Sequence, residues 1–181
     1  MAIKEGLQYF YDKKGKLRCY DPNLRYKDIT KSFLKNKKPG QGKITFSPEY
    51  DIKNHKNEIK IAYWILKKFG GNIHLIKEVD EDKVKTPDFI WNGKWWELKS
   101  PSTINAISSK VGKGISQMKN RPEIKPGGLI IDLQDSNKLS KNQIRSGIER
   151  KMNYDCDISM KVIVKRKDKI VLILDAKYKK A

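Results

Sequence analysis

The sequence is poor in the residues that build disulfide frameworks and histidine–cysteine metal sites. It contains two cysteines, Cys19 and Cys156, which stand far apart and form no CxxC pair, and two histidines, His55 and His74. This scarcity argues against a disulfide-rich scaffold, a zinc knuckle and a histidine-based metal nuclease. A reducing compartment is the simplest expectation for such a chain.

Long apolar runs are also missing. No stretch approaches the roughly 18 apolar residues of a membrane helix, and the segment after Met1 lacks the apolar core of a signal peptide. We therefore expect a protein that does not enter a membrane and that acts in a cytoplasm. Any export would depend on a secretion system that this chain does not encode.

Acidic residues are scarce relative to basic ones. The 40 lysine and arginine residues outnumber the 21 aspartate and glutamate residues, which gives a formal net charge of +19 and a pI near 9.8. Because the basic residues are spread along the whole chain, a polyanionic partner, above all nucleic acid, is the leading expectation. A basic surface that only keeps the protein soluble is the alternative. Nothing in the sequence indicates a small-molecule cofactor.

The order of the elements predicts an α/β domain with a mixed β-sheet and flanking helices. Residues 1–50 mix aromatic and basic residues, and we interpret them as a basic N-terminal extension with a small hairpin and a flexible basic linker at 35–43. Residues 51–181 form the main domain. Its expected elements are a helix at 54–69, strands at 73–79, 89–91 and 94–98, a helix at 102–121, a strand at 129–133, a helix at 140–152, and strands at 160–165 and 169–174.

The dipeptide Asn92-Gly93 predicts a tight hairpin that brings two acids together. A two-residue turn at this point places Asp88 directly opposite Glu97. Because strand side chains alternate, Lys99 shares their face of the hairpin. The other face carries Phe89, Trp91, Trp96 and Leu98, which can pack against a helix.

This cluster suits phosphodiester hydrolysis. Opposed carboxylates on adjacent strands repel by roughly 0.2 to 1 kcal/mol, and by more where water is excluded. Mg²⁺ offsets such repulsion, since it takes one or two carboxylates and fills its other positions with water and phosphate oxygens. Lys99 would then orient or deprotonate the attacking water and neutralise charge on the phosphate. The alternative is a charged hairpin edge in which Lys99 pairs with one acid.

The pattern Thr86-Pro87-Asp88-Phe89, followed by Trp96-Glu97-Leu98-Lys99, resembles the signature of PD-(D/E)XK nucleases. The order of helix, three strands, helix and strand over residues 54–133 resembles the core of that superfamily. The resemblance implies a restriction-endonuclease-like fold in which Asp88, Glu97 and Lys99 are catalytic. It also implies a divalent metal cofactor, Mg²⁺ or Mn²⁺, with Zn²⁺ as a third option.

The same resemblance points to residues on the two helices. Glu58 occupies the place at which the first helix often supplies another catalytic acid and metal ligand, although a glutamate is favourable at any helix N-terminus. Gln117 matches the polar residue with which the second helix often contacts substrate. Lys110 lies on the same helix face, where a solvated position explains it almost as well. The residues expected to contact nucleic acid are Lys94, Lys110, Lys113 and Arg121.

A second D-x-K pattern, Asp175-Ala176-Lys177, competes for the site. With a turn at Lys167-Asp168, Met160 would stand opposite Asp175, so that no second carboxylate meets it. We therefore expect the reactive centre at the first hairpin.

From Asn57 to Leu133 the chain more specifically resembles the C-terminal toxin domains of contact-dependent growth inhibition systems and related polymorphic toxins. The shared features are a Glu-bearing helix, Gly-Gly, TPDF, NGKWWELKSP and a Gln-bearing helix. The resemblance implies a toxin delivered into a target cell, where it cleaves transfer RNA, and an acidic immunity protein as partner. Residues 1–50 do not align with that family and could extend the substrate platform. A DNA endonuclease of restriction, junction-cleaving or bacteriocin type and a non-catalytic nucleic-acid-binding protein remain alternatives.

Overall fold

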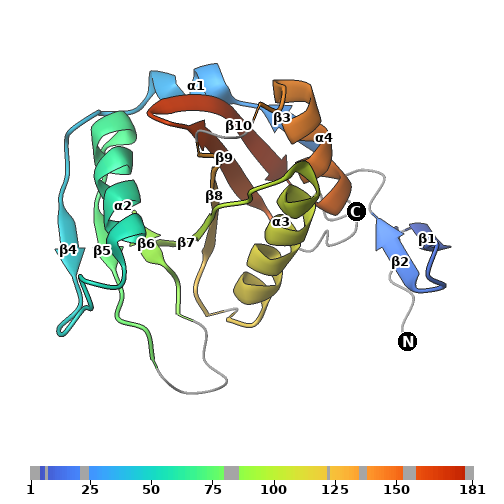
Figure 1. Ribbon diagram of the computed structural model, residues 1–181, viewed down its shortest axis with the longest axis horizontal. Helices are drawn as coiled ribbons and strands as arrows, with labels where there is room; N and C mark the ends of the chain where they lie inside the picture. The colour runs from blue at the N-terminus through green and yellow to red at the C-terminus, as the bar shows by residue number, and fades with distance from the viewer. Residues whose placement is uncertain are drawn as a thin grey trace.

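A mixed sheet forms the centre of the molecule in the computed structural model (Figure 1). The structure describes residues 5–6, 8–20, 25–79, 86–121, 123–134, 138–152 and 158–177. The strand order of the eight-stranded sheet is β3 (Arg25–Asp28), β10 (Lys169–Lys177), β9 (Met160–Arg166), β8 (Pro126–Asp132), β7 (Lys94–Lys99), β6 (Phe89–Trp91), β5 (Ile73–Leu75) and β4 (Ile44–Phe46). The mixed α/β class that the sequence predicts is confirmed.

Helices cover both faces of this sheet. One face packs against α3 (Ile104–Lys119) and α4 (Lys141–Met152), and the other packs against α2 (Lys56–Phe69) and the short α1 (Thr30–Lys35). In α2 the buried residues Ile61, Ala62, Ile65 and Phe69 recur at helical spacing, which gives this helix one apolar face. None of the helices in the described ranges is both long and apolar enough to cross a membrane.

The elements after residue 54 lie where the sequence predicts them, with changed ends. The strand expected at 73–79 ends at Leu75, because its neighbours β4 and β6 each pair with it over three residues. The strand expected at 129–133 begins earlier, at Pro126, since β8 runs parallel to β7 from that point. Residues 80–82 and Cys156 lie outside the described residues.

The sheet includes strands from both sides of the boundary expected at residue 50. β3 pairs antiparallel with β10, and β4 pairs parallel with β5. The segment interpreted as a flexible linker is bonded to the end of α2: the amide of Gly40 donates to the Leu66 carbonyl at 2.7 Å, and the amide of Gly71 donates to the Gln41 carbonyl at 2.7 Å. The predicted N-terminal hairpin is present as β1 (Gln8–Tyr11) and β2 (Leu17–Tyr20), which form a separate two-stranded sheet.

The competing D-x-K strand differs from its predicted register. The turn at Lys167-Asp168 forms as expected, but the ladder between β9 and β10 shifts by one residue beyond Ile170. Asp175 therefore lies opposite Lys161. The predicted partner Met160 is wrong, because an irregularity of the β-bulge kind adds a residue to one strand. A lysine faces Asp175 across the ladder, and no second carboxylate does.

Asp28, the last residue of β3, is bonded to residues of α1 and α4. Its carboxylate accepts hydrogen bonds from the Thr30 amide at 3.0 Å and the Thr30 hydroxyl at 2.6 Å, and it lies 2.9 Å from the ammonium of Lys141. Partial burial raises the pKa of Asp28, but these partners outweigh it and lower the pKa from 3.8 to about 2. Because the pKa of Asp28 is lower in the folded than in the unfolded protein, its ionised carboxylate stabilises the fold at pH values above the unfolded-state pKa. This stabilisation is lost as the pH falls from about 4 toward 2.

We expect Asp28→Asn to lower the free energy of unfolding by about 1 kcal/mol at pH 7, a figure reduced for solvent screening because the side chain is 30% exposed. Urea unfolding of variant and parent at pH 7 and at pH 2.5 measures the effect. The difference should shrink at the lower pH, and Lys141→Met should cause a similar loss at pH 7. A loss of equal size at both pH values would contradict the assignment to the Asp28 charge.

Candidate active site

β6 and β7 form the hairpin that the sequence predicts. Asn92 and Gly93 have positive φ angles of 50° and 76°, which a two-residue turn of this kind requires. The ladder pairs Phe89 with Trp96. The predicted register is therefore confirmed, and its continuation by one residue brings Asp88 and Glu97 to the open end of the hairpin.

Successive side chains of β7 point to opposite faces of the sheet, as the sequence predicts. Trp95 packs in the core beneath α3 and α4, whereas Trp96 packs in the core beneath α2. Glu97 and Lys99 follow Trp95 at every second position and so lie on the α3 side. Leu98 packs against the α2 core.

Glu97 is the centre of a chain of hydrogen bonds. Its side chain is 2% exposed, and its Oε1 accepts from the indole Nε1 of Trp95 at 2.6 Å. Its Oε2 accepts from Nζ of Lys99 at 3.0 Å, and the same Nζ donates to Oε1 of Gln117 at 2.7 Å. The structure thus brings together three residues that the sequence predicts for the site, and two acceptors hold the Lys99 amine.

Asp88 lies beside this cluster, directly before β6 begins. Its Oδ2 accepts a hydrogen bond from the Leu98 amide at 2.6 Å. Burial is the main cause that raises the pKa of Asp88, to about 7, and the Glu97 carboxylate adds to it, while the Leu98 amide and Lys99 oppose it. Asp88 and the buried Glu97 are therefore neighbouring carboxylates, and a further cation beside them would favour the ionised form of Asp88.

Glu58 lies in the first turn of α2, near the cluster. Its charge contributes to the raised pKa of Asp88, and its Oε1 lies 3.7 Å from Nδ1 of His55. Within the part of the chain that the structure describes, no three His, Cys, Asp or Glu side chains gather closely enough to hold a metal ion. Asp88, Glu97 and Glu58 are therefore neighbours but are not assembled as a three-carboxylate site.

Two residues of the site escaped the sequence analysis. Trp95 donates to Glu97, and its place two residues earlier on the same strand face is a signal that could have revealed it. Tyr50 follows β4, and its pKa is raised by burial and then by the charges of Glu58 and Asp88. No motif marks Tyr50, because only the three-dimensional fold brings it near the hairpin.

The basic residues expected to contact nucleic acid come from β7, α3 and the segment after α3. Lys94 is exposed beside the hairpin turn, roughly 10 Å along the strand from Glu97. Lys110 is half-buried and Lys113 is exposed on α3, and Arg121 follows that helix and pairs with Glu123. Gln117 is the α3 residue that touches the cluster directly.

Comparison with known proteins links the same stretch to a toxin family. Residues 85–170 match the family model described as the contact-dependent growth inhibition CdiA C-terminal domain. Among solved structures, the CdiA-CT/CdiI toxin and immunity complex from Burkholderia pseudomallei is similar, with 20% identity, a TM-score of 0.44, and coverage of 71% of this chain and 97% of that chain. No curated protein matches the chain. The stretch that holds Asp88, Glu97, Lys99 and Gln117 is therefore similar to the CdiA C-terminal domain family.

Proposed function

We propose that this protein is a metal-dependent nuclease of the PD-(D/E)XK type that cleaves transfer RNA as a contact-dependent growth inhibition toxin. The observation that carries the proposal is the buried chain of Glu97, Lys99 and Gln117 beside Asp88. A buried carboxylate with a raised pKa beside other charged groups, as Asp88 is, is typical of reactive centres. The order α2, β5, β6, β7, α3 and β8 is the one expected of a PD-(D/E)XK core.

Mg²⁺ or Mn²⁺ suits these residues better than Zn²⁺. Asp88 and Glu97 can supply the one or two carboxylates that Mg²⁺ takes from a protein. Zn²⁺ sites rely mostly on cysteine and histidine, whereas the contacts of Asp88 and Glu97 are with a backbone amide, an indole and a lysine. A bound divalent cation would act as a Lewis acid at the phosphate and lower the pKa of an attacking water.

The protein's own residues would position the reacting groups. Lys99 can donate a hydrogen bond to a non-bridging phosphate oxygen and offset the charge that develops there. Gln117 keeps the Lys99 amine in place, because its carbonyl accepts one of the amine's hydrogen bonds. Trp95 fixes the Glu97 carboxylate in the same way. Trp95 and Gln117 are positioning residues in this scheme.

The proposed substrate and partners follow from charge and family. A net charge of +19 favours a phosphate-rich substrate, and folded RNA offers phosphates and shape to a basic surface. The similarity to CdiA C-terminal domains supports delivery into a target cell and an immunity protein in the producing cell. Such a partner would be acidic, because complementary charge speeds association with a strongly basic chain.

The test is an assay with total transfer RNA and, in parallel, plasmid DNA. Each is incubated with the protein and Mg²⁺ or Mn²⁺, and then with a chelator in excess. We expect the RNA to be cut, the plasmid to remain intact and the chelator to stop the reaction, because the carboxylate pair needs its cation.

Two results would contradict the proposal. A cut plasmid with intact RNA would identify a DNA endonuclease built on the same site. Tight binding without cutting of either substrate, unchanged in Glu97→Gln, would identify a non-catalytic nucleic-acid-binding protein.

A further inference from the structure

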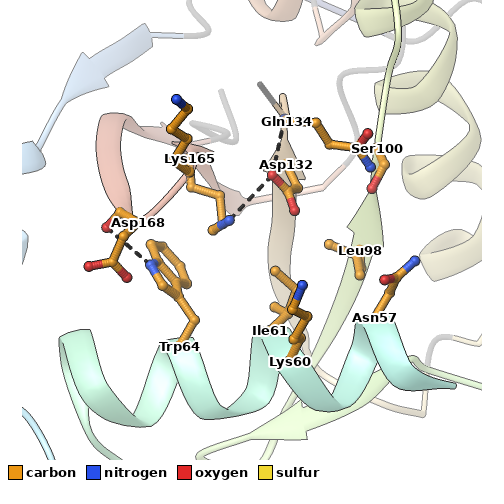
Figure 2. Close-up of a pocket in the computed structure, with 11 residues that line it drawn as sticks. Asn57, Lys60, Ile61, Trp64, Leu98, Ser100, Asp132, Gln134, Lys165 and Asp168 are labelled. Carbon is orange, nitrogen blue, oxygen red and sulfur yellow. Dashed lines mark hydrogen bonds and ion pairs between the residues drawn. The ribbon is translucent and has the colours of Figure 1, made fainter. Parts of the chain in front are cut away.

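A hollow lies next to the proposed active site, across β7 from Glu97 and Lys99. Its volume is about 790 Å³, and it opens at the carboxyl ends of the parallel strands β7, β8 and β9. Figure 2 shows residues of α2 rising toward these strand ends, with Leu98 between them. We name it the strand-end pocket. Its size lies within the range of about 300 to 1,000 Å³ that is usual for small-ligand sites.

An ion pair between the buried Lys165 and Asp132 forms one wall of the strand-end pocket. Lys165 is 7% exposed, and its Nζ lies 3.3 Å from Oδ1 of Asp132 and 5.2 Å from the ring centroid of Trp64 (Figure 2). Oδ1 of Asp132 also accepts from the Gln134 amide at 3.2 Å. A lysine withdrawn from water is tolerated only where partners compensate it. These contacts therefore hold the wall in one arrangement before any ligand arrives.

The remaining lining combines three kinds of surface. Ile61 and Leu98 are apolar, Asn57 and Gln134 are side-chain amides at the rim, and Lys60 is an exposed cation. An amide offers both donors and an acceptor, as the edge of a nucleic acid base requires. Unpaired RNA bases are recognised in this manner, by contact with their flat faces and hydrogen bonds at their edges. The cation suits the phosphate of the same nucleotide.

The strand-end pocket and the active site share two elements. β7 directs Glu97 and Lys99 to one face, whereas Leu98 on its other face and Ser100 just after the strand line the pocket. α2 carries Glu58 near the cluster and Asn57 at the pocket. The two sites therefore meet at the carboxyl end of β7, where an RNA strand with a phosphate at Lys99 would pass Ser100.

We propose that the strand-end pocket binds one unpaired RNA nucleotide next to the cleaved bond and selects it by its base. Its connection with cleavage rests on the nuclease function proposed above. Binding of a nucleotide requires no catalysis and can be measured separately.

Binding is tested by calorimetry on the full chain carrying Glu97→Gln, titrated with each of the four 5′-ribonucleoside monophosphates and with inorganic phosphate. We expect at least one monophosphate to bind more tightly than inorganic phosphate. Asn57→Ala and Lys60→Ala should each weaken that binding about fivefold, the size expected for one lost hydrogen bond. Both positions are exposed on α2, where alanine favours the helix, so the variants should fold.

Lys125→Ala is the matched control, because it removes an exposed lysine just before β8, at the opposite end of that strand from Asp132. It should leave the affinity unchanged. Monophosphates that bind no better than phosphate, or an equal loss in Lys125→Ala, would overturn the proposal.

Cleavage assays distinguish a failure of the pocket proposal from a failure of the proposed nuclease function. In the chain with Glu97 intact, Asn57→Ala should change which base is preferred beside the cut and leave the chelator sensitivity unchanged. An unchanged base preference would contradict base selection by the pocket, and the proposed nuclease function would be unaffected. Nucleotide binding in a protein that cuts no RNA would sink the nuclease and retain the binding site.

Discussion

Replacing Lys99 with alanine should lower the rate of RNA cleavage by about three orders of magnitude, the size typical of losing a donor that stabilises transition-state charge. The amine lies 3.0 Å from Glu97 and 2.7 Å from Gln117, and its side chain is 11% exposed. No other described lysine makes these contacts, so no neighbour can replace it. Initial rates of transfer RNA cutting, followed on denaturing gels, measure the loss.

Two further variants make this result specific. Lys99→Gln keeps a donor for the buried Glu97 carboxylate, so that a loss of activity in a protein of normal unfolding temperature reports chemistry rather than folding. Lys177→Ala removes the lysine of the second D-x-K pattern and should cut RNA at the parent rate. Full activity in Lys99→Ala together with an inactive Lys177→Ala would move the site to the β10 strand.

Glu97→Gln should lower cleavage by about three orders of magnitude or more while RNA binding persists. Glutamine has nearly the same size and can still accept the Trp95 indole hydrogen bond. It removes the charge that pairs with Lys99 and that would hold a divalent cation. Since most of the affinity for RNA comes from phosphate contacts along the basic surface, the dissociation constant should change little.

The measurements are single-turnover cleavage, RNA binding by fluorescence anisotropy and Mn²⁺ binding by calorimetry. Mn²⁺ affinity should fall about tenfold or more in Glu97→Gln. Glu123→Gln removes an exposed carboxylate paired with Arg121 and serves as the control for charge alone. Parent-like cleavage in Glu97→Gln would show that the buried carboxylate takes no part in the reaction.

Local sequence rules were sufficient for the centre of the site. The Asn92-Gly93 turn determines which residues pair across β6 and β7, and alternation then assigns Glu97 and Lys99 to one face. The helical spacing that ends at Gly70 likewise located α2 and Glu58. Each of these inferences uses residues that are close in sequence, where propensity and geometry act directly.

Features that depend on distant parts of the chain could not be predicted. The pairing of β3 with β10 and the shift beyond Ile170 are decided by the packing of the whole sheet. Tyr50 and the Asp132–Lys165 wall are brought to their places by elements with no sequence relation to the motif. The place of the Glu58 side chain, beside His55, likewise depends on tertiary packing, and its role as a metal ligand stays a prediction.

β3 and β4 lie at opposite edges of the eight-stranded sheet, although they are near neighbours along the chain. The segment from Asp28 to Ile44 therefore crosses roughly 34 Å of sheet. Phe33 packs within this segment against the core, with its ring centroid 5.5 Å from that of Phe69 and 6.4 Å from that of Trp91. This contact ties the crossing segment, and with it both edge strands of the sheet, to the apolar core beneath α2.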